Sequence, residues 1–133
     1  MTCFRGILSV VPKYFLRALN AYAPPLLWAG VIFIFSAQSV LPGFDVDLTD
    51  FLFKKLAHMF VYGVLYALLF RAVNLERGST KKNWVVPFLL CLTYALLDEV
   101  HQSFTPNRTP SLRDVGYDFL GASVAFLKIY RYI

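Results

Sequence analysis

A chain of 133 residues has room for a single domain, and its composition excludes an ordinary soluble one. Hydrophobic residues make up 58% of the chain and charged residues only 16%, against about 25% in soluble globular domains. So short a soluble protein could not bury that much apolar surface, because small domains leave much of their surface exposed. The composition therefore predicts an integral membrane protein.

The first twenty residues form a basic amphipathic segment. Apolar residues recur at helical spacing from Phe4 to Leu19, while Arg5, Lys13 and Arg17 lie mostly on other faces of the helix. Cations dispersed in this way are not typical of a cleavable signal peptide. We expect residues 1–20 to lie in the membrane interface, ahead of a transmembrane domain formed by residues 21–133.

Four hydrophobic stretches follow, and each predicts a helix. The predicted helices are 21–37, 50–73 with Asp50 as the N-cap, 84–102, and 111–130. A Pro-Gly turn at 42–43, a polar loop at 74–83 and a Pro-flanked loop at 106–110 separate them. The expected fold class is all-α, a polytopic bundle of about four transmembrane helices.

The distribution of the cations gives the bundle an orientation. With the N-terminus inside, nine Lys and Arg residues fall on the cytoplasmic side and four on the opposite side. The positive-inside rule then predicts that both termini are cytoplasmic. No basic stretch interleaved with exposed aromatic residues accompanies the net charge of +5, so no nucleic-acid partner is expected.

Polar residues gather at the extracytoplasmic ends of these helices, where seven of the eight acidic residues lie. The uncharged stretches 56–70 and 83–97 hold 15 residues each, fewer than the roughly 20 that cross a bilayer. Some polar residues must therefore lie within the outer leaflet and face the bundle interior. Ionisable residues placed there indicate a functional site.

Helical spacing puts these residues on shared faces. Lys55, His58 and Tyr62 are separated by three and four positions, which places them on one side of the second helix. The other spaced pairs are Asp98 with Gln102, Asp114 with Asp118, and Gly121 with Ala125, the last as small residues suited to close helix packing.

Several of these segments together resemble the VanZ-like family of bacterial membrane proteins. The segments are 35–38 (FSAQ), 55–62 (KLAHMFVY), 98–104 (DEVHQSF) and 108–114 (RTPSLRD), followed by Asp118 and Gly121. The resemblance covers about residues 33–125. Two positions depart from the family's pattern: Lys54 stands where an acidic residue is usual, and Asp118 where asparagine is frequent.

The resemblance implies a bacterial cytoplasmic-membrane protein. The VanZ-like family is named for a protein of teicoplanin (glycopeptide) resistance, and it is distantly similar to membrane enzymes that exchange lipid headgroups, such as phosphatidylserine synthases. It therefore implies that the protein modifies, or transfers a group on, a phospholipid headgroup or a lipid-linked cell-envelope precursor at the outer leaflet.

The residues allow such chemistry. The catalytic candidates are His58, Asp98, Glu99 and Asp114, and the substrate-binding candidates are Ser36, Gln38, Lys55, Gln102, Arg108 and Asp118. We expect His58, oriented by Asp98 or Glu99, to deprotonate a hydroxyl or water. Lys55 and Arg108 would hold a phosphate and offset its developing charge.

Four alternatives stay open at this point. No cofactor is expected, but Asp114 and Asp118 could bind a divalent cation together with Glu99. Ser111 and Asp114 also fit a capping box at the start of the last helix. Finally, the pocket could bind a lipid headgroup or a glycopeptide-like ligand without chemistry, or the protein could be a transporter, for which four short helices would need to oligomerise.

Overall fold

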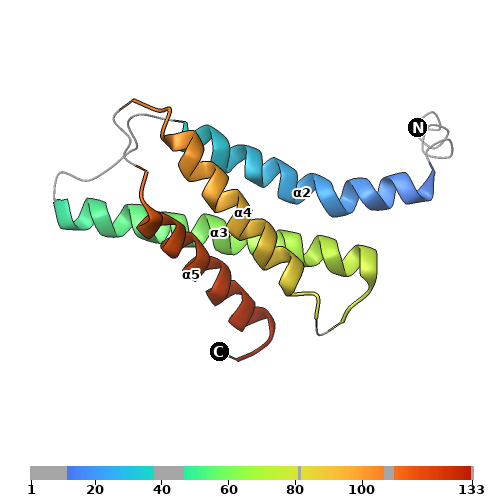
Figure 1. The fold of residues 1–133 in the computed structure, drawn as a ribbon. Coiled ribbons are helices and arrows are strands. Elements are labelled where there is room, and N and C mark those ends of the chain that lie inside the picture. Colours follow the sequence, from blue (N-terminus) through green and yellow to red (C-terminus); the bar gives the residue numbers. More distant parts are fainter. Residues whose placement is uncertain (1–11, 38–46, 81, 107–109, 133) are drawn as a thin grey trace, which may run out of the picture.

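The computed structural model describes residues 12–37, 47–80, 82–106 and 110–132. Within these ranges the chain forms four helices and no strand (Figure 1). The helices are α2 (Lys13–Ser36), α3 (Asp47–Arg77), α4 (Val85–Gln102) and α5 (Leu112–Ile129). The predicted all-α helical bundle is confirmed.

Two helices are longer than the sequence predicted. Helix α2 begins at Lys13, so residues 13–20 continue directly into the first predicted span. Helix α3 includes Asp47, so the prediction that Asp50 is its N-cap was wrong. The helix ends at Arg77, and Gly78 follows with a φ of 75°, a left-handed conformation that glycine adopts without strain.

Two of the described helices are long and apolar enough to cross a membrane: α2 and residues Phe51–Arg77 of α3. Large apolar side chains remain exposed on both, including Leu27 at 72% and Phe60 at 65%. Helices α4 and α5 have 18 residues each and carry acidic residues at one end. This agrees with the short third and fourth helices expected from the sequence.

Helix α3 lies at the centre of the bundle and contacts each of the other three helices. Its most extensive contact is with α5. The two helices run parallel, since contacting residues advance together along both: His58 meets Asp118, and further along Tyr66 meets Phe126. Any polar residues at the start of α3 and the start of α5 are therefore brought together.

Glycine permits a very close approach of α3 and α5. A Cβ atom added at Gly121 would lie only 2.0 Å from the carbonyl oxygen of Met59, and one added at Gly63 would lie 3.1 Å from the carbonyl oxygen of Gly121. The backbones touch directly here, as small residues allow between membrane helices. No side chain fits at Gly121 unless the helices separate.

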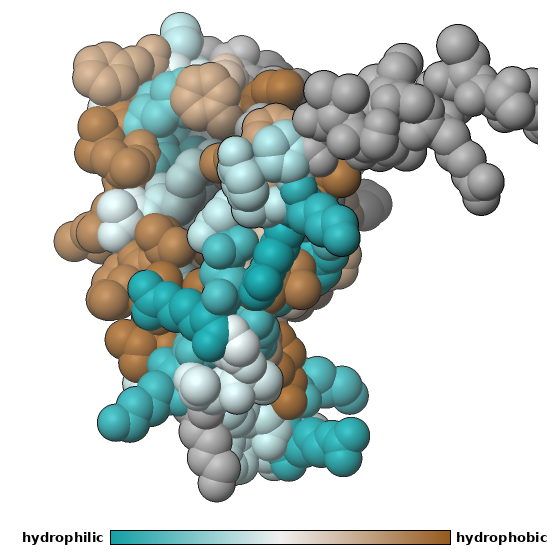
Figure 2. Space-filling model, turned by 90° about the vertical axis from the view of Figure 1, so that its right-hand side faces the viewer, coloured by the Kyte–Doolittle hydropathy of each residue, from teal (hydrophilic) through white to brown (hydrophobic). Residues whose placement is uncertain are grey.

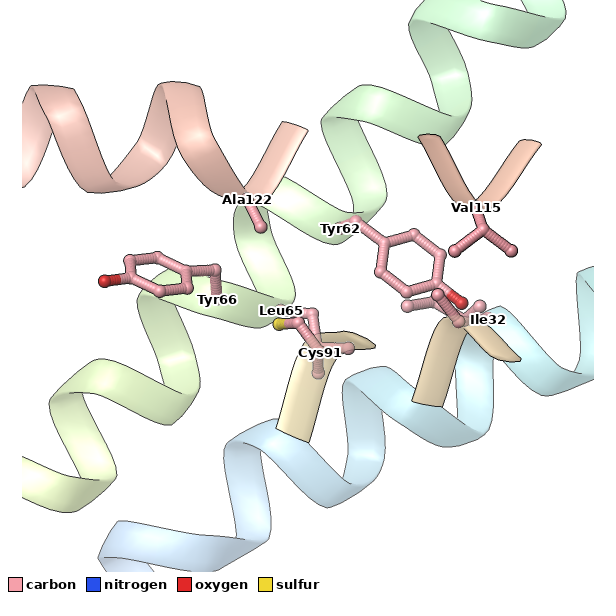
Figure 3. Packing of buried hydrophobic residues seen from close by; sticks show 8 residues of the cluster. Ile32, Tyr62, Leu65, Tyr66, Cys91, Val115 and Ala122 are labelled. Carbon is pink, nitrogen blue, oxygen red and sulfur yellow. The ribbon is translucent and has the colours of Figure 1, made fainter. Parts of the chain in front are cut away.

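A buried cluster holds the middle of the bundle (Figure 3). It comprises Ile32, Tyr62, Leu65, Tyr66, Cys91, Ala95, Val115 and Ala122, contributed by all four helices. Two side-chain bonds add to it: the Trp28 indole donates to the Val61 carbonyl at 2.9 Å, and the Tyr94 hydroxyl donates to the Ala29 carbonyl at 2.6 Å. Helix α2 is thereby fixed to both α3 and α4.

The end of the bundle formed by the start of α2 and the end of α3 is strongly hydrophilic, with apolar residues at its margin (Figure 2). Arg71 donates to the backbone oxygen and to the side-chain oxygen of Asn20, both at 2.9 Å. Arg17 donates to the Leu75 carbonyl. The cations at this end thus bind oxygen atoms of the neighbouring helix, and the acidic residues of α4 and α5 lie at the other end.

Replacing Gly121 with alanine tests the contact between α3 and α5. The added methyl group would collide with the Met59 carbonyl, and we expect the free energy of unfolding to fall by about 1–3 kcal/mol. Gly116→Ala is the matched control in the same helix, since nothing lies within 4 Å of its Cβ position and alanine favours a helix by up to about 1 kcal/mol. Thermal unfolding in detergent micelles compares the two variants. Equal melting temperatures would contradict the close contact.

Candidate functional site

The four helices bring their polar residues together at one end of the bundle, on the left in Figure 1. Ser36 ends α2, and Lys55 and His58 lie in the early turns of α3. The other contributors are Asp98, Glu99 and Gln102 in the last turns of α4, and Asp114 and Asp118 in the first turns of α5. Of the ten predicted site residues, Gln38 and Arg108 lie outside the described residues.

Two polar pairs join α3 to α5. Lys55 forms an ion pair with Asp114, and Nδ1 of His58 lies 2.9 Å from Oδ1 of Asp118. The pairs follow from the parallel run of the helices, because positions 55 and 58 on α3 face positions 114 and 118 on α5. Lys55 also lies over the ring of Tyr117, with 5.3 Å between Nζ and the ring centroid. Lys55 is thus held on several sides.

A third polar contact lies within α4. The amide nitrogen of Gln102 donates to Oδ2 of Asp98 at 3.0 Å, across one helical turn. Both side chains are buried, with Asp98 5% and Gln102 4% exposed. The other oxygen of Asp98, Oδ1, is buried and has no hydrogen-bond partner in the part of the chain that the structure describes.

Glu99 binds the start of the last helix. Its Oε2 accepts the backbone N–H of Ser111 at 2.6 Å, and the Ser111 hydroxyl accepts the N–H of Arg113. Ser111 is therefore the N-cap of α5, but the capping-box alternative was wrong, because Asp114 turns to Lys55 instead of to Ser111. A carboxylate from another helix occupies the place that the box would have used, and it stabilises the helix dipole there.

The partner predicted for His58 was also wrong. The sequence pointed to Asp98 or Glu99, whereas in the structure the imidazole pairs with Asp118. Asp98 is held by Gln102, and Glu99 by the backbone of Ser111. Among the described residues no three His, Cys, Asp or Glu side chains are grouped so that they could hold a metal ion. Lys55 and His58 face the acids of α5.

A cavity of about 340 Å³ opens beside these pairs, between α2, α3 and the end of α4. Most of its wall is apolar and includes Trp28, Phe35 and Val61. Its polar lining consists of Ser36, Lys54, His58, Tyr62, Asp98 and Gln102. The cavity therefore combines an apolar wall with a cation, an imidazole and a carboxylate, a combination that suits an amphiphilic molecule.

Comparison with known proteins identifies the group to which this chain belongs. The family model described as VanZ/LLP1 matches residues 6–132, nearly the whole chain. The chain belongs to the VanZ/LLP1 family. Neither a curated protein nor a solved structure matches it. Family membership and two membrane-length apolar helices make this VanZ/LLP1 chain a membrane protein.

Among the cavity-lining residues that the sequence did not name as candidates are Lys54, Tyr62 and Trp28. Tyr62 was placed on the face of Lys55 and His58 but given no role, and the structure shows its ring 1% exposed in the wall of the cavity. Trp28 lies in a uniformly apolar stretch, where no signal separated it from lipid-facing residues. Only the fold shows that it contacts α3 and lines the cavity.

The pairing of His58 with Asp118 can be followed by nitrogen NMR, since the chain has only two histidines. Asp118→Asn replaces the carboxylate with an amide of the same shape and weakens the charge-assisted bond. We expect the ring-nitrogen resonances of His58 to shift. Those of His101, whose ring stacks on Phe33 at 4.1 Å between centroids, should stay in place. An unchanged His58 spectrum would rule out the pair.

Proposed function

We propose that this protein transfers or hydrolyses a phosphate-linked group on a phospholipid headgroup or on a lipid-linked cell-envelope precursor. The observation that carries the proposal is the pairing of His58 with Asp118 in the wall of a largely apolar cavity. A histidine oriented by a carboxylate is a common general base, and an apolar cavity beside it suits the chain of a lipid.

The extracytoplasmic side of the cytoplasmic membrane is the proposed place of this reaction. The polar pairs lie at the end of the bundle opposite to Arg17 and Arg71. Nine of the chain's Lys and Arg residues fall on that opposite side of the predicted spans, which favours a cytoplasmic position for it and for both termini. The substrate would then reach the cavity from the outer leaflet.

The proposed chemistry assigns a separate task to each ring nitrogen of His58. Nδ1 is held by Asp118, which fixes the imidazole and stabilises its charged form. Nε2 would accept the proton of a water or alcohol hydroxyl while the hydroxyl oxygen forms a new bond to phosphorus. The bond from phosphorus to the leaving oxygen breaks, and His58 returns the proton to that oxygen.

A cation in the cavity wall supports the proposal that a phosphate group binds beside His58. Lys54 lines the cavity together with His58, which lies four positions after it on α3. Lys55, which the sequence analysis assigned to phosphate binding together with Arg108, forms an ion pair with Asp114. In this proposal Lys55 and Asp114 position α3 against α5, and Lys54 offsets the charge of the transferring phosphate.

Comparative lipidomics tests the reaction in cells that lack the protein and are complemented with variants. We expect His58→Gln to leave the lipid profile of the deletion unchanged, because the proton acceptor is lost. His101→Gln, the other histidine of the chain, should restore the wild-type profile. A profile restored by folded, membrane-inserted His58→Gln would refute a catalytic role for this residue.

A non-enzymatic binding protein is the second candidate, and the apolar character of the cavity favours it. Such a protein would retain a lipid or glycopeptide-like ligand in the cavity, and its effect on the envelope would survive His58→Gln. Glycopeptide resistance, for which the VanZ family is named, is compatible with both candidates, since either would alter access to envelope precursors.

A further inference from the structure

Three residues that line the cavity, each from a different helix, carry a buried polar atom without a hydrogen-bond partner among the described residues. The atoms are Oγ of Ser36 from α2, the hydroxyl of Tyr62 from α3 and Oδ1 of Asp98 from α4, and none has a hydrogen-bond partner within the described parts of the chain. These side chains are 6%, 1% and 5% exposed. Leaving one buried polar atom unpaired is costly, so three in the wall of one cavity point to a ligand.

The three atoms share one property, which is that each can accept a hydrogen bond. The Asp98 carboxylate already receives one from Gln102, and a second donor would complete it. The nearby side chains of Lys55 and His58 are engaged by Asp114 and Asp118. A ligand that supplies hydrogen-bond donors and a positive charge would complement the two hydroxyl oxygens and the Asp98 carboxylate.

We propose that the cavity binds the primary ammonium group of an amine-bearing phospholipid. An ammonium group offers three N–H donors and one positive charge, which matches two hydroxyl oxygens and one carboxylate. A hydroxyl headgroup offers one donor and no charge, and a phosphate placed at Asp98 would be repelled. This inference rests on the proposed function and names its substrate class.

The rest of the cavity is consistent with the remainder of such a lipid. Lys54 and His58 line the wall, where they would meet the phosphate that joins the amine to the glycerol. Trp28, Val31 and Phe35 of α2 form an apolar wall for the start of an acyl chain. The ammonium thus lies toward α4 and the phosphate toward the early turns of α3.

A series of four phospholipids with identical chains tests the assignment. Phosphatidylethanolamine, its N-methyl and N,N-dimethyl derivatives and phosphatidylcholine all keep the positive charge, while the number of N–H donors falls from three to none. Native mass spectrometry of the full chain, released from mixed micelles that hold equal amounts of the four lipids, measures which are retained. We expect retention to fall along the series by about tenfold or more, as the loss of hydrogen bonds from a charged group predicts.

Variants link the preference to the three atoms. Tyr62→Phe and Ser36→Ala each remove one acceptor, and Asp98→Asn removes the charge. Each substitution should therefore reduce the difference in retention between phosphatidylethanolamine and phosphatidylcholine. Ser123→Ala is the control, because Ser123 lines a separate apolar cavity between α4 and α5 and donates to its own helix at Phe119. It should keep the wild-type preference. Melting temperatures identify the folded variants, and if Asp98→Asn does not fold, the other two carry the test.

Two results would overturn the inference. One is equal retention of all four lipids by the wild-type protein, and the other is stronger retention of phosphatidylglycerol, which has no amine. Neither depends on turnover, so the reaction at His58 would remain to be judged by lipidomics. Conversely, retention could fall steeply from phosphatidylethanolamine to phosphatidylcholine while His58→Gln restores the lipid profile. That combination would support the ammonium site and refute the proposed reaction.

Discussion

The close contact between α3 and α5 sets the geometry on which the rest of this bundle depends. Gly121 lets the backbone of α5 lie directly against Met59, and the parallel run of the helices then fixes the register of every contact along them. Toward one end this register pairs His58 with Asp118, and toward the other it packs Tyr66 against Phe126. The aromatic core and the polar site are therefore consequences of the same backbone contact.

Desolvation explains how the acids of the site are arranged. A carboxylate away from water is stable only when a cation or hydrogen-bond donors surround it. Asp114 and Asp118 obtain a lysine and a histidine from α3, and Glu99 obtains the N–H of Ser111. Asp98 obtains only the amide of Gln102 for one of its oxygens. Across the described ranges, Glu99 and Asp118 each keep one unpaired buried oxygen as well, but of these three acids only Asp98 lines the cavity.

The VanZ/LLP1 family assignment says where the protein works, and the structure says which residues form its candidate site. Family membership identifies a membrane protein, and it covers the chain from residue 6 to residue 132. The geometry adds a histidine with an orienting carboxylate, an apolar cavity beside it, and unpaired acceptors within that cavity. Together they direct attention to an amphiphile with a polar headgroup, and they make the roles of His58 and Asp98 separable by experiment.

The sequence by itself determined the helical class, the approximate helix positions and the gathering of polar residues at one end, because composition and helical periodicity are local properties of the chain. It also pointed to Gly121 as a site of close packing. Only the tertiary structure decided that His58 meets Asp118, that Glu99 caps α5, and that Tyr62 and Trp28 line a cavity. Asp98, Glu99, Asp114 and Asp118 are equivalent in a sequence, since all four lie at the same level of the predicted bundle. What distinguishes them is the lateral order and rotation of the helices, which side-chain packing sets and no local pattern encodes.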